Sequence, residues 1–393
     1  MGWSMILIKK ANLLSMADVN YEIRDILINK GKIVKIAKNI NEEDYKNATV
    51  IKAVGRYVTP GLIDAHCHLG ILEEVIKEGD DVNEFSSPIT PHLRALDGIN
   101  PNDRYFKSAL EAGITTVNIG PGSANLIGGT FAILKLRGKT IEDMVLVEES
   151  AMKMALGENP KGSYGKKGQT PFTRMASAAL IREQLTKAKQ YYIDYQMYLD
   201  KLNNGQDVKF NFDFRMDSLK RVFEGLPVKL HAHRADDIQT AVRILEEFNL
   251  NYTIEHCTEG YMIPEFLQKH QVRCVIGPTM NYKSKPEVQN KTFDAGRILN
   301  DYKIPFAVMT DHPVIELDNT MLQLGRFVRS GLNELDALKA VTINAAKLTN
   351  IDDRVGSIEV GKDADIVIWS HNPFHYLAQP KTILIDGKIV LKK

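Results

Sequence analysis

The sequence predicts an α/β protein: a TIM-like (β/α)8 barrel accompanied by a small β-sandwich domain. Short apolar runs alternate with helical stretches through the middle of the chain, which is typical of a parallel sheet covered by helices. β-rich segments occupy both ends of the chain. A chain of 393 residues is too long to fold around a single small hydrophobic core. Roughly eight strand-and-helix units over about 290 residues suit a barrel of this kind.

The two ends of the chain are expected to share one β-sandwich. Residues 1–57 contain apolar or alternating runs broken by Lys-Gly pairs, and residues 353–393 contain similar runs broken by Gly, Asp and Lys. Chain termini often lie close together, so both segments can complete one domain beside a barrel formed by residues 58–352. Within the barrel, residues 177–202 predict a long amphipathic helix.

Composition argues against several classes of protein. The chain is 44% hydrophobic and 25% charged, with a net charge of +1, so it lacks the basic excess of nucleic-acid and membrane surfaces. No apolar run approaches the roughly 20 residues of a membrane span, and we expect no signal peptide. The 3 cysteines cannot all pair, which favours a reducing, cytoplasmic location.

Polar side chains collect where the predicted barrel strands end. Four such strands end in histidine or aspartate: His66 and His68, His231 and His233, His256, and Asp311. Side chains at positions i and i+2 of a strand point the same way, so both members of an H-x-H pair can face the barrel axis. Barrel active sites lie at the C-terminal strand ends, where these residues would meet.

Imidazole and carboxylate groups are suitable ligands for zinc, although manganese, iron or cobalt could occupy the same site. One ion takes about four ligands including a water, and the candidates exceed that number, which favours two ions. A bound ion would lower the pKa of its water to about 7. Asp311 could bind the metal, orient that water and accept its proton.

Each candidate also has a purely structural interpretation. A lone H-x-H pair is a weak signal, His256 could be a core histidine, and Asp311 could cap a helix. The joint placement of all of them at one end of the barrel favours a metal site instead. Cys67 and Cys257 adjoin candidate ligands and should therefore point away from them, so we do not expect a cysteine nucleophile.

At these residues the chain resembles the amidohydrolase superfamily. Residues 58–69, VTPGLIDAHCHL, resemble its opening strand, and residues 354–369 resemble its return from the barrel to the sandwich. His231, His256 and Asp311 follow in the expected order. The resemblance is greatest to the branch of imidazolonepropionase-related enzymes and metal-dependent Xaa dipeptidases. It implies that metal-bound hydroxide attacks an amide-like C–N bond of a dipeptide or N-acyl amino acid.

The dipeptidase resemblance implies further site residues. In those enzymes a lysine on the fourth barrel strand is carboxylated by CO2 and bridges two metals, and Lys153 holds the matching position, with Glu149 as a competing bridge and Lys161 as a weaker one. His233 lies where these dipeptidases often carry tyrosine, so it would bind substrate and stabilise an oxyanion, or else support its neighbour. Arg234 could bind a substrate carboxylate or lie in a solvated loop.

Two Gly-rich stretches are expected to be loops. Residues 120–130 lack the Lys-Ser/Thr of a phosphate-binding loop and suit a barrel loop near the substrate. Residues 157–174 suit either a solvated loop or a mobile lid, in which Lys161, Tyr164 or Arg174 would reach the substrate.

Two other functions remain open from the sequence. The residues after His68, LGILEE, lack the arginine-containing motif expected of imidazolonepropionase. This weakens the interpretation as a cyclic-amide hydrolase or deaminase but does not exclude it. A non-catalytic binding protein on the same scaffold would be expected to have lost ligands. The expected partner is a small-molecule substrate, with no nucleic acid or membrane; a homo-oligomer is left open.

Overall fold

The computed structural model describes residues 5–17, 22–73 and 80–393. Its central sheet has eight strands in the order β13-β12-β11-β10-β9-β8-β7-β6. These strands are β6 (Leu62–Cys67), β7 (Ile114–Ile119), β8 (Ile127–Lys135), β9 (Val145–Ala155), β10 (Val228–Ala232), β11 (Tyr252–His256), β12 (Cys274–Ile276) and β13 (Phe306–Val308). The sheet is the nearly closed barrel that the strand pattern predicts.

The carboxylate of Asp64 joins the two end strands of the barrel. Its Oδ1 accepts a hydrogen bond from the His66 backbone N–H at 2.9 Å, and its Oδ2 accepts the Thr310 N–H at 2.9 Å and the Thr310 hydroxyl at 2.7 Å. The His68 N–H donates to the His312 carbonyl at 2.9 Å. These bonds draw β6 against the segment that follows β13.

One strand runs against the expected direction. β8 pairs antiparallel with both β7 and β9, whereas the other neighbouring pairs of the barrel are parallel. The expectation of a wholly parallel sheet is therefore wrong here, and residues 127–130, expected in a loop, begin β8. The connections at 120–126 and 136–144 are too short for the crossover of about a dozen residues that a parallel strand requires.

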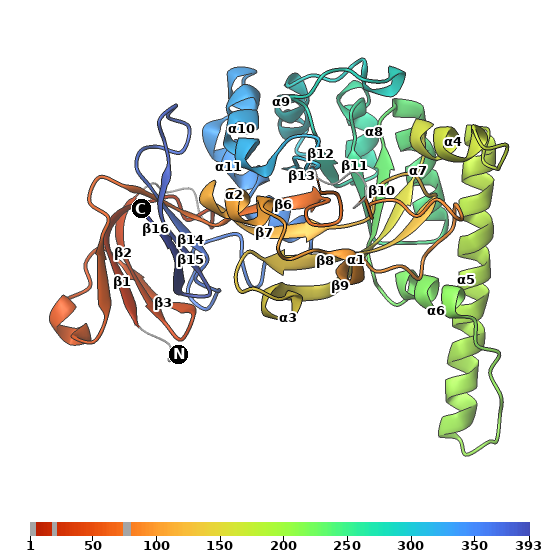
Figure 1. Cartoon of the computed structure of the whole chain (residues 1–393), viewed down its shortest axis with the longest axis horizontal. Coiled ribbons are helices and arrows are strands. Elements are labelled where there is room, and N and C mark those ends of the chain that lie inside the picture. The colour runs from red at the N-terminus through yellow and green to blue at the C-terminus, as the bar shows by residue number, and fades with distance from the viewer. Residues whose placement is uncertain (1–4, 18–21, 74–79) are drawn as a thin grey trace.

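Helices cover the outside of the barrel (Figure 1). They are α1 (Ala95–Gly98), α2 (Tyr105–Glu111), α3 (Ile141–Met144), α4 (Glu158–Gly165), α5 (Arg174–Asn203), α6 (Phe214–Lys220), α7 (Ala235–Glu247), α8 (Pro264–Lys269), α9 (Asp294–Asp301), α10 (Thr320–Arg329), α11 (Glu334–Ala340) and α12 (Ile343–Leu348). In α7, Ile238, Ala241, Val242 and Leu245 are buried at helical spacing. This apolar stripe holds the helix against β10 and β11.

The long helix predicted over residues 177–202 is α5, which spans Arg174–Asn203. The hydroxyl of Thr173 accepts the Ala176 N–H and caps its first turn. The buried positions of α5 lie in its first two thirds, while its far end projects from the body of the molecule (Figure 1). Within the described ranges, no helix is both long and apolar enough to cross a membrane.

Strands from the two ends of the chain form one sheet beside the barrel (Figure 1). Its strand order is β16-β15-β14-β5-β1-β2-β3, with β4 paired to β1. The strands are β1 (Ile6–Leu13), β2 (Glu22–Asn29), β3 (Lys32–Ala37), β4 (Thr49–Lys52), β5 (Tyr57–Pro60), β14 (Ile366–Trp369), β15 (Pro380–Ile385) and β16 (Lys388–Lys392). The pairing gives a single connected sheet, so a two-sheet sandwich is not confirmed, and the domain boundaries remain predictions.

A buried cluster of charges ties the barrel to the terminal sheet. Lys135, the last residue of β8, is fully buried. Its Nζ lies 2.8 Å from Asp363 Oδ2, 3.0 Å from Asp365 Oδ2 and 2.5 Å from Asp386 Oδ1. Asp363 and Asp365 precede β14, and Asp386 follows β15. One barrel cation therefore pairs with carboxylates from the terminal sheet.

Replacing Lys135 with methionine is expected to lower the free energy of unfolding by about 3–5 kcal/mol, because it leaves the buried Asp365 without a cation, whereas Asp363 and Asp386 keep other basic partners. Urea denaturation at pH 7 measures this change. Lys139→Met is the matched control, since Lys139 is exposed four residues later and should change the same quantity by less than about 0.5 kcal/mol. Equal stability of the two variants would contradict the role assigned to Lys135.

Candidate metal centre

Two groups of metal-ligating side chains lie at the C-terminal ends of the barrel strands. In each group, one donor atom per residue lies within 4.8 Å of the other two. The groups are His66, His68 and Asp311, and His231, His233 and His256. Five of these six residues are buried, and the Asp311 side chain is 13% exposed. The strand ends thus gather the histidines and the aspartate that the sequence singles out.

In the first group, Asp311 faces both histidines of β6. Its Oδ1 lies 3.2 Å from His68 Nε2 and 3.6 Å from His66 Nε2. His68 Nδ1 lies 2.7 Å from the Gly120 carbonyl oxygen, which can only accept, so Nδ1 carries a proton and Nε2 is the nitrogen that faces Asp311. Burial would raise the pKa of Asp311, but the hydrogen bond with His68 and the charge of Lys153 contribute to a net lowering of that pKa.

Behind the first group lies a buried ion pair that sequence reasoning missed. His66 Nδ1 donates to Glu255 Oε2 at 2.6 Å, and Lys229 Nζ lies 3.1 Å from Glu255 Oε1. Burial, followed by nearby Lys153, holds the pKa of His66 well below its usual range. A neutral His66 whose Nδ1–H is held by a carboxylate presents Nε2 as a metal ligand.

The second group comes from β10 and β11. His231 lies on β10 and His233 directly follows the end of that strand, and their ring centroids lie 4.6 Å apart. The centroid of His256 lies 4.2 Å from that of His231. Burial lowers the pKa of all three, that of His256 to about 3, so each is a neutral imidazole. Neutral imidazole is the form that binds metal.

Two ligands reach the site through left-handed backbone. In the ladder between β10 and β11, Glu255 is opposite His231 and His256 is opposite Ala232, so strand alternation alone would turn His256 away. The φ of His256 is 67°, which ends the alternation and brings its ring against His231. Asp311 likewise has a φ of 55°. Non-glycine residues held in this region cluster at functional sites.

Glu255 could not be predicted as a site residue from strand alternation once His256 was taken as the ligand. Neighbouring residues of a strand point to opposite faces, yet Glu255 shares the inward face of His231. The feature of the sequence that could have indicated Glu255 is an acidic residue next to a candidate ligand in a barrel strand. Only the φ of His256 allows both neighbours to serve the same site.

Lys153 is the bridge candidate that the structure places at the site. It is buried on β9, and its Nζ lies 3.3 Å from His66 Nε2. Burial lowers the pKa of Lys153 to about 8. Glu149 instead pairs with Arg221 and Arg94. Lys161 pairs with Glu158 at 3.4 Å and does not line the site cavity.

A cavity of about 300 Å³ opens beside both groups. Its lining includes His68, His231, His233, His256 and Asp311, together with Lys285 and Lys291. Arg234, expected to bind substrate, pairs with Asp236 at 2.9 Å and does not line this cavity. Lys285 and Lys291, from the irregular segment after β12, supply positive charge there instead, and no strand or helix pattern marked them in the sequence.

The segment expected to be a loop or a mobile lid is anchored. Residues 158–165 form α4, which corrects the expectation of a loop over 157–174. Tyr164 is fully buried and its hydroxyl donates to the Ser87 carbonyl at 2.8 Å. Arg174 Nε lies 3.0 Å from Asp237 Oδ1. Asn159 is the residue of α4 that lines the cavity.

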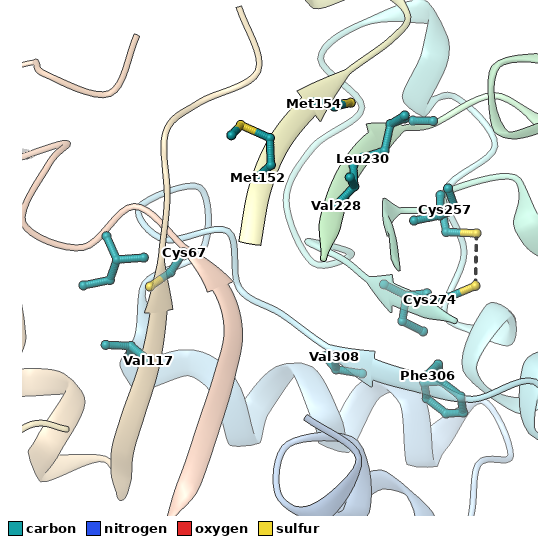
Figure 2. Close-up of a cluster of buried hydrophobic side chains, with 14 of the residues drawn as sticks. Cys67, Val117, Met152, Met154, Val228, Leu230, Cys257, Cys274, Phe306 and Val308 are labelled. Carbon is teal, nitrogen blue, oxygen red and sulfur yellow. Dashed lines mark hydrogen bonds between the residues drawn. The ribbon is translucent and has the colours of Figure 1, made fainter. Parts of the chain in front are cut away.

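The cysteines lie in the apolar core, away from the site. Figure 2 shows Cys67 near Val117, and Cys257 facing Cys274 with their sulfurs 3.5 Å apart. All three are free and buried. Burial raises the pKa of Cys67 well above its usual range, so it stays a thiol. A protonated, buried thiol is inert as a nucleophile.

The residues present fit a divalent ion. No described residue hydrogen-bonds either ring nitrogen of the buried His231. An unsatisfied buried polar group costs about 1–3 kcal/mol, and a metal ion would satisfy this one. Nitrogen and oxygen donors in this number suit zinc or a similar ion.

Comparison with known proteins identifies the family. Residues 57–390 match the amidohydrolase family. This chain belongs to the amidohydrolase family. The match covers the barrel and the part of the terminal sheet that follows it.

Individual relatives agree with this assignment. The chain is 28% identical over 387 residues to amidohydrolase tasK of Hapsidospora irregularis, covering 92% of this chain but 39% of that protein, so it spans well under half of that relative. It is 24% identical over 413 residues to imidazolonepropionase of Shewanella frigidimarina, covering 93% and 92% of the two chains. A crystal structure of an amidohydrolase from Thermotoga maritima MSB8 matches with 39% identity and a TM-score of 0.93, over 99% of this chain and 100% of that one.

In this amidohydrolase, Glu255→Gln is expected to weaken metal affinity by about 10- to 100-fold, because His66 loses its anionic partner. Titration against a chelator of known affinity measures the change. Glu246→Gln is the matched control: Glu246 Oε1 lies 2.9 Å from Nδ1 of His270, outside both ligand groups. If the two variants bind metal equally well, Glu255 does not position His66.

Proposed function

We propose that this chain is a metal-dependent hydrolase that cleaves an amide-like C–N bond of a small molecule. The observation that carries the proposal is the pair of ligand groups facing one cavity at the C-terminal end of the barrel. One or two divalent ions, with zinc the first candidate, would lower the pKa of a bound water to about 7 and so supply the nucleophile. A reducing, cytoplasmic location suits the three free cysteines.

Asp311 is proposed to move the proton. It lines the cavity, it contacts both histidines of the first group, and its lowered pKa keeps it a carboxylate at neutral pH. As a carboxylate it can accept a proton from the attacking water and pass that proton to the leaving nitrogen. Protonation makes the amine a viable leaving group, so one residue serves both halves of the reaction.

Lys153 is proposed to carry a carboxyl group. Its neutral amine would add to CO2, forming an N–C bond and losing one proton, to give an anionic carbamate. Burial disfavours the ammonium form, and Nζ lies against a ligand nitrogen of His66 rather than against a carboxylate. A carbamate there would present two oxygens to the ions, whereas an ammonium group would repel them.

The substrate is proposed to be a dipeptide or an N-acyl amino acid. Such molecules carry a carboxylate close to the scissile amide. Lys285 lines the cavity, with its Nζ 2.7 Å from Asn159 Oδ1 and 2.6 Å from Glu287 Oε1. We propose that Lys285 binds the substrate carboxylate, the role expected of Arg234. Arg234 instead pairs with Asp236 outside the cavity. The volume of about 300 Å³ suits a small substrate.

A cyclic amide is the second candidate substrate. The likeness to imidazolonepropionase covers 92% of that enzyme, which favours this alternative. A non-catalytic binding protein is less well supported, because the two ligand groups lie together at the barrel mouth. His233 is expected either to donate to an oxyanion or to bind metal.

Asp311→Asn is expected to lower kcat by about 10²- to 10⁴-fold, because the amide cannot accept the proton. The measurement is turnover of a library of dipeptides, N-acyl amino acids and cyclic amides, with bound metal determined in parallel and the fold checked by circular dichroism. Asp301→Asn is the control, since Asp301 pairs with Arg297 on the surface. Near-normal turnover by Asp311→Asn, or full activity of metal-free protein, would contradict the proposal.

Lys285→Met is expected to raise KM for N-acyl amino acids about tenfold or more, because one charged hydrogen bond to the substrate is lost. KM for the corresponding C-terminal amides should change little. Lys283→Met provides the control, since Lys283 is exposed two residues away and does not line the cavity. An equal rise in KM for acids and amides would show that Lys285 does not bind the substrate carboxylate.

A further inference from the structure

We infer that His233 is a protein ligand of a metal ion and that it completes a three-histidine site. This site lies beside the one formed by His66, His68 and Asp311. The inference rests on the proposed function only in taking the protein to bind divalent metal. It assigns to His233 a role other than donation to an oxyanion, and it can be tested without any substrate.

The three rings surround a common point. The centroids of His231 and His233 lie 4.6 Å apart, those of His233 and His256 4.5 Å, and those of His231 and His256 4.2 Å. The triangle is nearly equilateral, and one nitrogen from each ring lies within 4.8 Å of the other two. Nitrogens around a tetrahedral zinc ion lie about 3.3 Å apart, so small side-chain rotations would complete the coordination.

The hydrogen bonds behind two of the rings point their other nitrogens at that common space. His256 Nδ1 lies 2.8 Å from the Gly277 carbonyl oxygen, so Nδ1 donates and Nε2 keeps its lone pair. His233 Nδ1 lies 2.8 Å from the Thr258 hydroxyl oxygen, which can accept in the same way. Metal-binding histidines are usually oriented by such a partner on the second ring nitrogen.

The third ring and the free edge of His233 support the same conclusion. No described residue hydrogen-bonds either nitrogen of His231, so this buried imidazole needs a partner. Glu287 Oε1 lies 3.8 Å from His233 Nε2, beyond hydrogen-bond distance. When Nδ1 donates to the Thr258 hydroxyl, Nε2 carries a lone pair, which can bind a metal ion but cannot donate to an oxyanion.

A three-histidine site has a consequence for the second ion. Three neutral protein ligands leave one tetrahedral position open, which is the pattern of catalytic rather than structural zinc sites. The ion would then be retained by β10, by the residue that follows it, and by β11. Its binding would not require the carbamate proposed for Lys153.

The test counts bound ions. The full chain is stripped with a chelator, reloaded with Zn²⁺, freed of excess metal and analysed for zinc per chain. We expect two ions in the wild type, one in His233→Asn, and two in His270→Asn, whose histidine pairs with Glu246 outside both ligand groups. Two ions in His233→Asn with unchanged affinity would overturn the inference and leave the oxyanion role.

A second variant keeps the test decisive if His233→Asn folds poorly. Thr258→Val removes the hydroxyl behind His233 but leaves the ligands, so the affinity for the second ion should fall about 10- to 100-fold while that for the first is unchanged. Equal affinities in Thr258→Val and the wild type would count against the inference. Two bound ions without turnover of any amide would instead contradict the proposed function and leave the three-histidine site intact.

Discussion

The structure depends on the buried carboxylate of Asp64, which joins the first and last strands of the barrel. It accepts hydrogen bonds from the backbone of His66 and from both the backbone and the hydroxyl of Thr310. His66 is itself a ligand of the first group, and Thr310 directly precedes the ligand Asp311. Closing the barrel and assembling the first ligand group are therefore one event. Burial raises the pKa of Asp64 to about 6, and the hydrogen bonds that it accepts offset part of that effect.

Beneath the ligands, the barrel holds charges where an ordinary core is apolar. Lys229 and Glu255 pair deep between the strands, and Phe131 lies with its ring centroid 5.5 Å from Lys153 Nζ and 5.6 Å from Lys229 Nζ. The pair costs desolvation energy, so its presence needs a function. Holding the His66 ring in one tautomer supplies one, because a ligand must present a fixed lone pair.

Much of the fold follows from pattern, and its main deviation follows from chain length. Alternating strands and helices predicted the barrel, and the β-rich ends predicted a shared β-sandwich, of which the structure shows one connected sheet built from both ends. Pattern alone did not predict the reversed β8, because an apolar run looks the same in either direction. The short connections on both sides of β8 exclude a parallel crossover, and the antiparallel strand is the result. The position of Lys285 in the cavity could not be predicted from the sequence either, because it depends on the path of an irregular segment.

The sequence by itself determined which residue types meet at the barrel mouth, because strand alternation and the C-terminal strand ends fix where histidine and aspartate side chains point. It left open which neighbours support them and how each imidazole is oriented. The tertiary structure decided those points: the φ of His256 lets Glu255 and His256 serve one site, and Thr258 sets the ring of His233. The reason is physical, since tautomer and ring orientation depend on partners that are close only after the strands have closed into a barrel.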